Sequence, residues 1–167
     1  MTHGVVLVRT AKYSTYCAAE SVRELSGTEL VVLKTKVVKG FGRGGKQLGV
    51  PTANVEQDVV DGMKLELTGV FLGWARVRGQ VYKAVTSVGW NPHFGNKHKT
   101  IEPYLVGEFD RDFYGEEMAL VLCGYLRSEL SFTSLQALKD AIWLDIESAR
   151  VALDEPRFQK YLAMLPP

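Results

Sequence analysis

Closely spaced β-like segments are the feature that most constrains the fold of this chain. Each is rich in β-branched and aromatic residues, and the five are Leu30–Val38, Gly69–Val77, Gln80–Val88, Ile101–Phe109 and Glu117–Arg127. Short strands spaced this closely leave little room for the crossover helices that parallel strands require. The pattern therefore favours an antiparallel barrel or sandwich over a parallel α/β sheet.

Two turns punctuate these segments. Arg78 and Gly79 form a two-residue link between adjacent segments, and glycine suits the positive φ of such a hairpin turn. The letters "DRDFYG", residues 110–115, separate the last two segments in a similar way. The first link predicts a hairpin of antiparallel strands, and the second predicts only a turn.

The pattern changes to helical periodicity near residue 133. Apolar residues then recur at spacings of three and four along one predicted face: Leu135, Leu138, Ile142, Ile146, Ala149 and Leu153. Thr133 or Ser134 can cap the first turn, and we expect Pro156 to end the helix. The predicted layout is a mainly β barrel closed or flanked by one long C-terminal helix.

Length and composition indicate one globular domain. The chain has 167 residues, 46% hydrophobic and 23% charged, and a formal net charge of +1, which argues against a nucleic-acid-binding protein. Cys17 and Cys123 predict reduced thiols, and no apolar run is long enough for a membrane span. We assign residues 1–29 to an N-terminal extension and 30–167 to the barrel domain, and expect a monomer.

The N-terminal segment leaves localisation open. Its first 19 residues include Arg9 and Lys12 but no acidic residue before Glu20, a composition that a transit peptide also has. The other interpretation of this segment, which we favour, is a variable strand and loop. We therefore expect a cytoplasmic protein, with a mitochondrial or other organellar location as the alternative.

The stretch "GFGRGGKQLGVPTANV", residues 40–55, contains two phosphate-binding patterns, G-x-G-x-x-G and an incomplete G-x-x-x-x-G-K. Both motifs require a helix directly after the loop, and Gly49 and Pro51 disfavour that helix. Glycine backbone and Lys46 still suit an anion, and Thr52 and Asn54 offer oxygen ligands of the kind that Mg²⁺ prefers. A solvated loop is the alternative interpretation of the glycines.

A second polar cluster follows in "SVGWNPHFGNKHKTIEPYL", residues 87–105. It gathers histidine, asparagine and lysine residues before Glu102, which stands in an apolar strand. A carboxylate beside such a loop is suited to act as a general base. We do not assign His93 or His98 to a metal.

Four segments together resemble the riboflavin kinase (flavokinase) family: "GFGRGGKQLGVPTAN", "SVGWNPHFGNKHKTIEPYL", "EFDRDFYGEE" and "GYLRSELSFTSLQAL". The resemblance covers the chain from about Val37 to Leu153. It implies a compact, six-stranded, Greek-key-like antiparallel β-barrel with a C-terminal helix. It also implies transfer of the γ-phosphoryl group of ATP to the ribityl 5′-hydroxyl of riboflavin, giving FMN and ADP.

The resemblance assigns roles to particular residues. Glu102 is the implied general base for in-line transfer, and Thr52 and Asn54 are the implied ligands of Mg²⁺, or of Zn²⁺ or Mn²⁺, bound with ATP. The implied ATP-binding residues are Gly40, Arg43, Gly45, Lys46, Thr52, Asn54, Leu105 and Tyr114. The implied flavin-binding residues are Arg127, Phe132, Ser134 and Leu135.

Some positions depart from the family pattern, and other functions stay open. Gly45 stands where Ser is frequent, Ser128 where Pro is usual, and Gly107 where His is frequent. A non-catalytic flavin-binding barrel module is the main alternative to a kinase. A fragment of a bifunctional FMN/FAD synthetase is a further one, although about 36 residues before Val37 are few for another domain.

Overall fold

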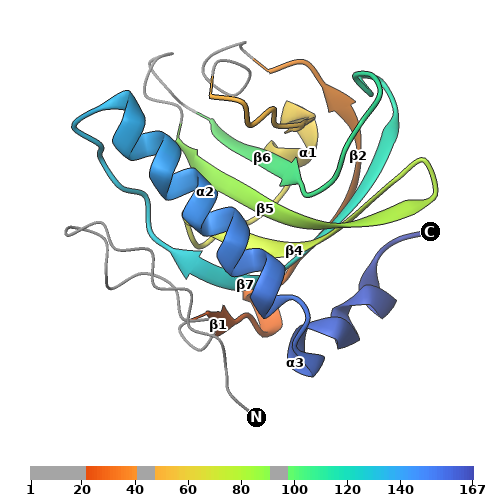
Figure 1. The fold of residues 1–167 in the computed structure, drawn as a ribbon. Helices are drawn as coiled ribbons and strands as arrows, with labels where there is room; N and C mark the ends of the chain where they lie inside the picture. Colours follow the sequence, from red (N-terminus) through yellow and green to blue (C-terminus); the bar gives the residue numbers. More distant parts are fainter. Residues whose placement is uncertain (1–21, 41–47, 91–97) are drawn as a thin grey trace.

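The computed structural model describes residues 22–40, 48–90 and 98–167 and shows a barrel of antiparallel strands flanked by a long helix (Figure 1). The strands are β1 (Arg23–Glu24), β2 (Val31–Val38), β3 (Asn54–Val55), β4 (Gly69–Val77), β5 (Gln80–Trp90), β6 (Lys99–Leu105) and β7 (Glu117–Arg127). The helices are η2 (Gly27–Glu29), α1 (Gln57–Asp61), α2 (Leu135–Ala152), α3 (Pro156–Gln159) and η4 (Lys160–Met164).

The sheet has the order β3-β2-β7-β4-β5-β6, and β1 adds to β7. Strands β4, β5 and β6 follow one another as neighbours, and β7 returns beside β4, which is the Greek-key arrangement. The backbone N–H of Ala53, just before β3, donates to the Pro103 carbonyl in β6 at 2.8 Å. This contact joins the two edges of the sheet, so the predicted Greek-key-like barrel with a C-terminal helix is confirmed.

The central strands are buried on both sides. Inside the barrel, Phe71 of β4 and Leu120 of β7 belong to one apolar cluster. Outside it, Leu72 and Val121 of the same strands pack in a second cluster with Ile146 of α2 and with the C-terminal helices. Two buried faces explain why β4 and β7 have continuous apolar sequences, whereas β2, exposed on its outer face, alternates.

The structure corrects three predictions about the last strands and the helix. The segment Ile101–Phe109 was expected to be one strand, but β6 ends at Leu105, and residues 106–116 form a connection to β7 that we call the crossover loop. Leu135 is 64% exposed, because α2 buries residues only from Ala141 onward. Pro156 begins α3 as its first residue, a position that tolerates the missing N–H, and α2 already ends at Ala152.

The C-terminal helices pack against the outside of the barrel and against the start of the described chain. Phe158 is fully buried, and its carbonyl accepts a hydrogen bond from Trp74 Nε1 at 3.1 Å. The Tyr161 hydroxyl has two acceptors within reach of its one proton, Glu24 Oε1 at 2.7 Å and the Leu25 carbonyl at 3.1 Å. None of the helices in the described part of the chain combines the length and apolar character needed to span a membrane.

We expect Phe158→Ala to lower the free energy of unfolding by about 3–5 kcal/mol, because it removes a large ring from a closely packed interior. Urea denaturation followed by tryptophan fluorescence measures the change. Met164→Ala, on a side chain that is 42% exposed, is the matched control and should have little effect. Equal stability of the two variants would show that the C-terminal segment is not part of the core.

Candidate functional site

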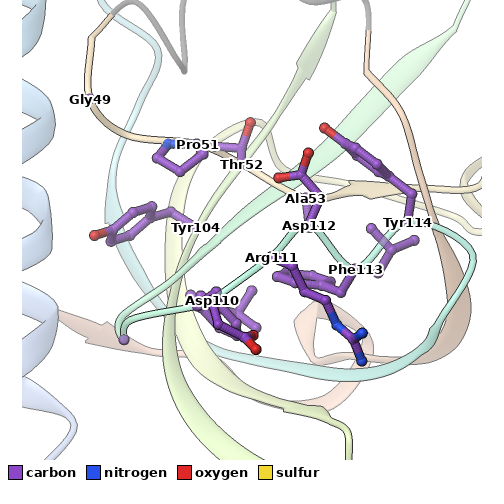
Figure 2. A pocket seen from close by; sticks show the side chains of 14 residues that line it. Gly49, Pro51, Thr52, Ala53, Tyr104, Asp110, Arg111, Asp112, Phe113 and Tyr114 are labelled. Atoms are coloured by element: carbon purple, nitrogen blue, oxygen red, sulfur yellow. The ribbon is translucent and has the colours of Figure 1, made fainter.

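A cavity of about 430 Å³ lies between residues 49–53, the end of β6 and the crossover loop. Figure 2 shows Pro51 and Thr52 along one wall, and Tyr104, Asp110 and Tyr114 among the side chains around them. Its lining combines aromatic rings, a hydroxyl and several charged groups. Such a mixture suits a ligand with one flat apolar part and one anionic part.

The barrel closure at Ala53 and Pro103 fixes which side chains meet beside this cavity. Both residues are buried, and neighbouring residues on extended backbone point to the opposite face. The four flanking residues are therefore partly exposed on the outer face: Thr52, Asn54, Glu102 and Tyr104. Three residues predicted for metal binding and catalysis thus lie on two adjacent backbone segments.

The carboxamide of Asn54 lies against Gly40 at the end of β2. A β-carbon built on Gly40 would collide with the Asn54 carboxamide, so a larger residue there would require this side chain to move. Val38 pairs with Asn54 in the β2–β3 ladder, which holds the two segments together. Gly40 therefore has a packing role beside the proposed metal ligand, in addition to any role in binding phosphate.

Glu102 lies in β6 opposite Ser87 of β5 and is partly exposed. Thr100, two residues earlier on the same face, donates from its hydroxyl to Glu102 Oε1 at 3.0 Å. Within the described ranges this is the carboxylate's one hydrogen bond, and no cationic side chain there pairs with it. The carboxylate is thus oriented on one oxygen and able to accept a proton on the other.

The predicted flavin-binding residues lie where β7 leads into α2. Arg127 forms a double hydrogen bond with Asp145 of α2, from Nε to Oδ1 at 2.9 Å and from Nη2 to Oδ2 at 2.7 Å. Its guanidinium carbon is 5.9 Å from the ring centre of Phe132. Ser134 caps α2 by accepting from the Ala137 N–H at 3.1 Å.

The ion pair of Arg127 and Asp145 is nearly inaccessible, with side chains 10% and 6% exposed. Burial raises the pKa of the Asp145 carboxyl, and Arg127 acts in the opposite direction by hydrogen bonding and by charge. The third nitrogen, Nη1, donates to the Ser128 carbonyl at 3.1 Å. Arg127 therefore fixes the start of the loop 128–134 to α2, because two of its nitrogens bind Asp145 and the third binds Ser128.

A glycine connects this loop to the strand that carries Glu102. A β-carbon on Gly89 would collide with the carboxylate of Glu129. Gly89 pairs with Thr100 across the β5–β6 ladder, and Thr100 in turn hydrogen-bonds Glu102. The flavin-side loop and the proposed base thus meet on one face of β5 and β6.

The structure brings together most of the predicted residues, in two groups. Thr52, Leu105 and Tyr114 line the cavity, whereas Arg127, Phe132 and Ser134 surround the entrance to α2. Leu135 is largely exposed and lines neither of the described pockets. The predicted residues Arg43, Gly45 and Lys46 lie outside the described residues.

Sequence reasoning missed part of the cavity wall. The side chains that it did not assign to a site include Tyr104 and, in the crossover loop, Phe109, Asp110, Arg111, Asp112 and Phe113. The acidic residues among them belong to the segment "DRDFYG", for which the sequence pattern predicts only a turn. The sequence pattern leaves only residues 110–116 between the two strands, whereas the structure lengthens this connection to residues 106–116, more than a hairpin needs.

Comparison with known proteins gives a consistent family. Residues 28–153 match the flavokinase family model, described as riboflavin kinase. The riboflavin kinase of Mus musculus is 48% identical over 127 residues, which cover 75% of this chain and 82% of that protein. The bifunctional riboflavin kinase/FMN phosphatase of Arabidopsis thaliana is 51% identical over 128 residues, and the match spans only 34% of its length.

A solved structure has the same architecture. The crystal structure of riboflavin kinase from Trypanosoma brucei aligns with a TM-score of 0.62 and 32% sequence identity. The alignment covers 83% of this chain and 92% of that one. The similarity therefore includes the barrel and is not confined to short motifs.

We expect Arg127→Met to lower the free energy of unfolding by about 3–5 kcal/mol at neutral pH, because it leaves a buried carboxylate unpaired. The pKa of Asp145 then lies further above its unfolded value, so folding takes up a proton. The loss of unfolding free energy should reach its maximum at pH values above that raised pKa. It should become smaller as the pH falls toward about 4. Urea denaturation at several pH values measures it.

The control is the double variant Arg127→Met with Asp145→Leu, which removes both charges from the interior. It should recover most of the lost stability, because no buried charge remains. A double variant as unstable as the single one, with the same pH dependence, would contradict this account of the ion pair.

Proposed function

Because the chain belongs to the riboflavin kinase family, we propose that it transfers the γ-phosphoryl group of Mg·ATP to the ribityl 5′-hydroxyl of riboflavin. The products are FMN and ADP. The observation that carries the proposal is the position of Glu102, a partly exposed carboxylate on the strand that joins the Thr52–Asn54 segment. That position lies between the cavity and the loop that leads into α2.

The cavity is the proposed nucleotide site. Thr52 and Leu105 line it next to the closure of the barrel, and Tyr114 lines it from the crossover loop. Aromatic rings at Tyr104 and Phe113 provide flat apolar surface suited to a purine. The phosphates would then extend past Thr52 toward Glu102. Residues 41–47 lie outside the described residues, and their glycines and Lys46 are of types that favour anions.

The oxygen atoms of Thr52 and Asn54 fit a divalent metal bound together with phosphate. Both donors are neutral, and among the described residues no three His, Cys, Asp or Glu side chains form a cluster that could hold a metal ion. Mg²⁺ commonly takes a few protein oxygens and completes its shell with phosphate and water. When bound, the metal would neutralise charge on the transferring phosphoryl group.

Glu102 is the proposed general base. Its carboxylate takes the proton as the O–H bond of the riboflavin 5′-hydroxyl breaks and a new bond to the γ-phosphorus forms. The bond to the β,γ-bridging oxygen breaks on the opposite side, and ADP leaves with that electron pair. Thr100 orients the carboxylate by hydrogen-bonding one oxygen, which leaves the other for the substrate hydroxyl.

The isoalloxazine ring is assigned to the loop 128–134. Phe132 supplies an aromatic face there, and Arg127 holds the start of the loop against α2. Gly89 lets Glu129 of this loop approach the strands that carry Thr100 and Glu102. In this proposal the ribityl chain would extend from the ring toward the base.

Incubation of the protein with riboflavin and Mg·ATP, followed by chromatography, tests the proposal directly. A kinase yields equal amounts of FMN and ADP. A non-catalytic flavin-binding module would bind riboflavin without forming FMN and would show no affinity for Mg·ADP. Either of those two results would overturn the proposed activity.

We expect Glu102→Gln to lower kcat by a factor of about 100 or more, because an amide cannot accept the proton. Steady-state FMN formation measures kcat, and thermal denaturation verifies that the variant folds. Glu66→Gln, on an exposed side chain, is the matched control and should leave kcat unchanged. Near-normal turnover of Glu102→Gln would remove Glu102 from the role of base.

We expect Thr52→Ala to require about tenfold more Mg²⁺ for half-maximal rate, because it removes one of two protein oxygens near the metal. Thr52→Ser keeps the hydroxyl and should behave like the parent protein. Calorimetric titration with ADP over a range of Mg²⁺ concentrations gives a second readout that is independent of turnover. If the Ala and Ser variants have the same Mg²⁺ dependence, Thr52 is not a ligand.

A further inference from the structure

The crossover loop, residues 106–116, is held by backbone hydrogen bonds at its two ends. Val106 N–H donates to the Lys83 carbonyl at 2.9 Å, and Gly115 N–H donates to the Val37 carbonyl at 2.7 Å. Residues 109–114 between these points line the cavity. Side-chain contacts must therefore fix the shape of this part of the wall.

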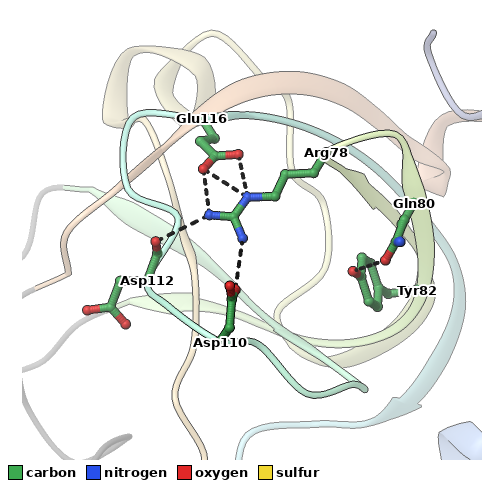
Figure 3. Close-up of polar contacts among 6 residues, drawn as sticks. All are labelled: Arg78, Gln80, Tyr82, Asp110, Asp112 and Glu116. Atoms are coloured by element: carbon green, nitrogen blue, oxygen red, sulfur yellow. Dashed lines mark hydrogen bonds and ion pairs between the residues drawn. The ribbon is translucent and has the colours of Figure 1, made fainter.

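Arg78 supplies the main polar contacts, as Figure 3 shows. Its Nε donates to both carboxylate oxygens of Glu116 at 2.9 Å, and Nη2 donates to Glu116 Oε1 at 2.7 Å. Nη1 lies 3.5 Å from Asp110 Oδ1, and Nη2 donates to the Asp112 carbonyl at 3.5 Å. One guanidinium thus contacts the crossover loop at three positions.

The backbone at Arg78 is unusual for arginine. Val77 pairs with Gln80, so Arg78 and Gly79 form a two-residue hairpin turn with φ values of +52° and +74°. Turns of this kind favour Asn, Asp or Gly at the first position, because a β-carbon disfavours the left-handed region. An arginine at this position indicates that its side-chain contacts offset the conformational cost of the positive φ.

The same hairpin contacts the crossover loop with an aromatic ring. Tyr82 of β5 lies with its ring centre 5.0 Å from that of Phe109, which is 4.9 Å from that of Phe113. Tyr82 also packs against Gly107, where a side chain would crowd the ring. The hairpin therefore supports the cavity wall by ion pairs from Arg78 and by the tilted contact of the Tyr82 ring with Phe109.

We propose that Arg78 is a positioning residue for the nucleotide site, which it maintains by fixing the crossover loop through Glu116 and Asp110. The inference rests on the proposed function, because it assigns the nucleotide to the cavity that this loop lines. Arg78 itself does not line the cavity, so its effect is indirect. The Arg78 and Glu116 side chains are 27% and 35% exposed, and a pair so exposed contributes little to global stability.

The test uses Arg78→Asn, which suits the turn and removes the guanidinium. We expect the KM for Mg·ATP and the Kd for Mg·ADP to rise about 3- to 10-fold. The kcat and the KM for riboflavin should change by less than twofold. Hydrogen exchange of amides 107–114 should become faster in the protein without any ligand, whereas exchange in β7 should not.

Two further variants make the result specific. The control variant is Arg23→Gln, which breaks another exposed pair, with Arg23 Nη1 2.7 Å from Glu29 Oε2. Neither residue lines the cavity, so this variant should leave the nucleotide affinity and the exchange of amides 107–114 unchanged. Glu116→Gln should reproduce the effect of Arg78→Asn, and the double variant should add little to either single one, because both remove the same interaction.

The outcomes separate this inference from the proposed function. Unchanged hydrogen exchange in Arg78→Asn, or faster exchange with unchanged Mg·ADP affinity, would overturn the positioning role while the kinase assignment stands. A parent protein that binds no Mg·ADP would overturn the nucleotide site, and the positioning role with it. Faster exchange together with weaker nucleotide binding supports the inference.

Discussion

One backbone hydrogen bond, from Ala53 to the Pro103 carbonyl, closes the barrel, and the geometry of the site depends on it. Side chains alternate between the two faces of extended backbone, so this register places Thr52 and Asn54 outside, beside the strand that carries Glu102. A shift by one residue would turn the same side chains into the apolar interior. The register that closes the barrel therefore also determines the positions of the site residues.

The strand order has a second consequence. Strands β6 and β7 are consecutive in the chain but are not neighbours in the sheet, so the connection between them has to cross the end of the barrel. The crossover loop passes β2, where Gly115 hydrogen-bonds Val37, and on the way it forms a wall of the cavity. Its backbone is paired mainly at the ends, so side chains of the β4–β5 hairpin determine its shape.

Most of the fold was predictable from local patterns. The hairpin at Arg78-Gly79, the strand Glu117–Arg127 and the Ser134 cap agree with the structure, because turn residues, β-branched runs and capping hydroxyls act over a few residues. The predictions are wrong where the burial of a residue depends on tertiary packing. The helical period placed Leu135 on the buried face, but the barrel does not reach the first turn of α2.

Local sequence patterns establish the class of fold, the order of the strands along the chain and the residue types suited to phosphate, metal and proton transfer. Which of these residues meet depends on the packing of the strands into a barrel. This packing placed Asn54 against Gly40, committed Arg127 to Asp145, and turned the charged segment after β6 into a cavity wall braced by Arg78. The physical reason is that propensities and periodicity act over a few residues, whereas these contacts join segments that only barrel closure brings together.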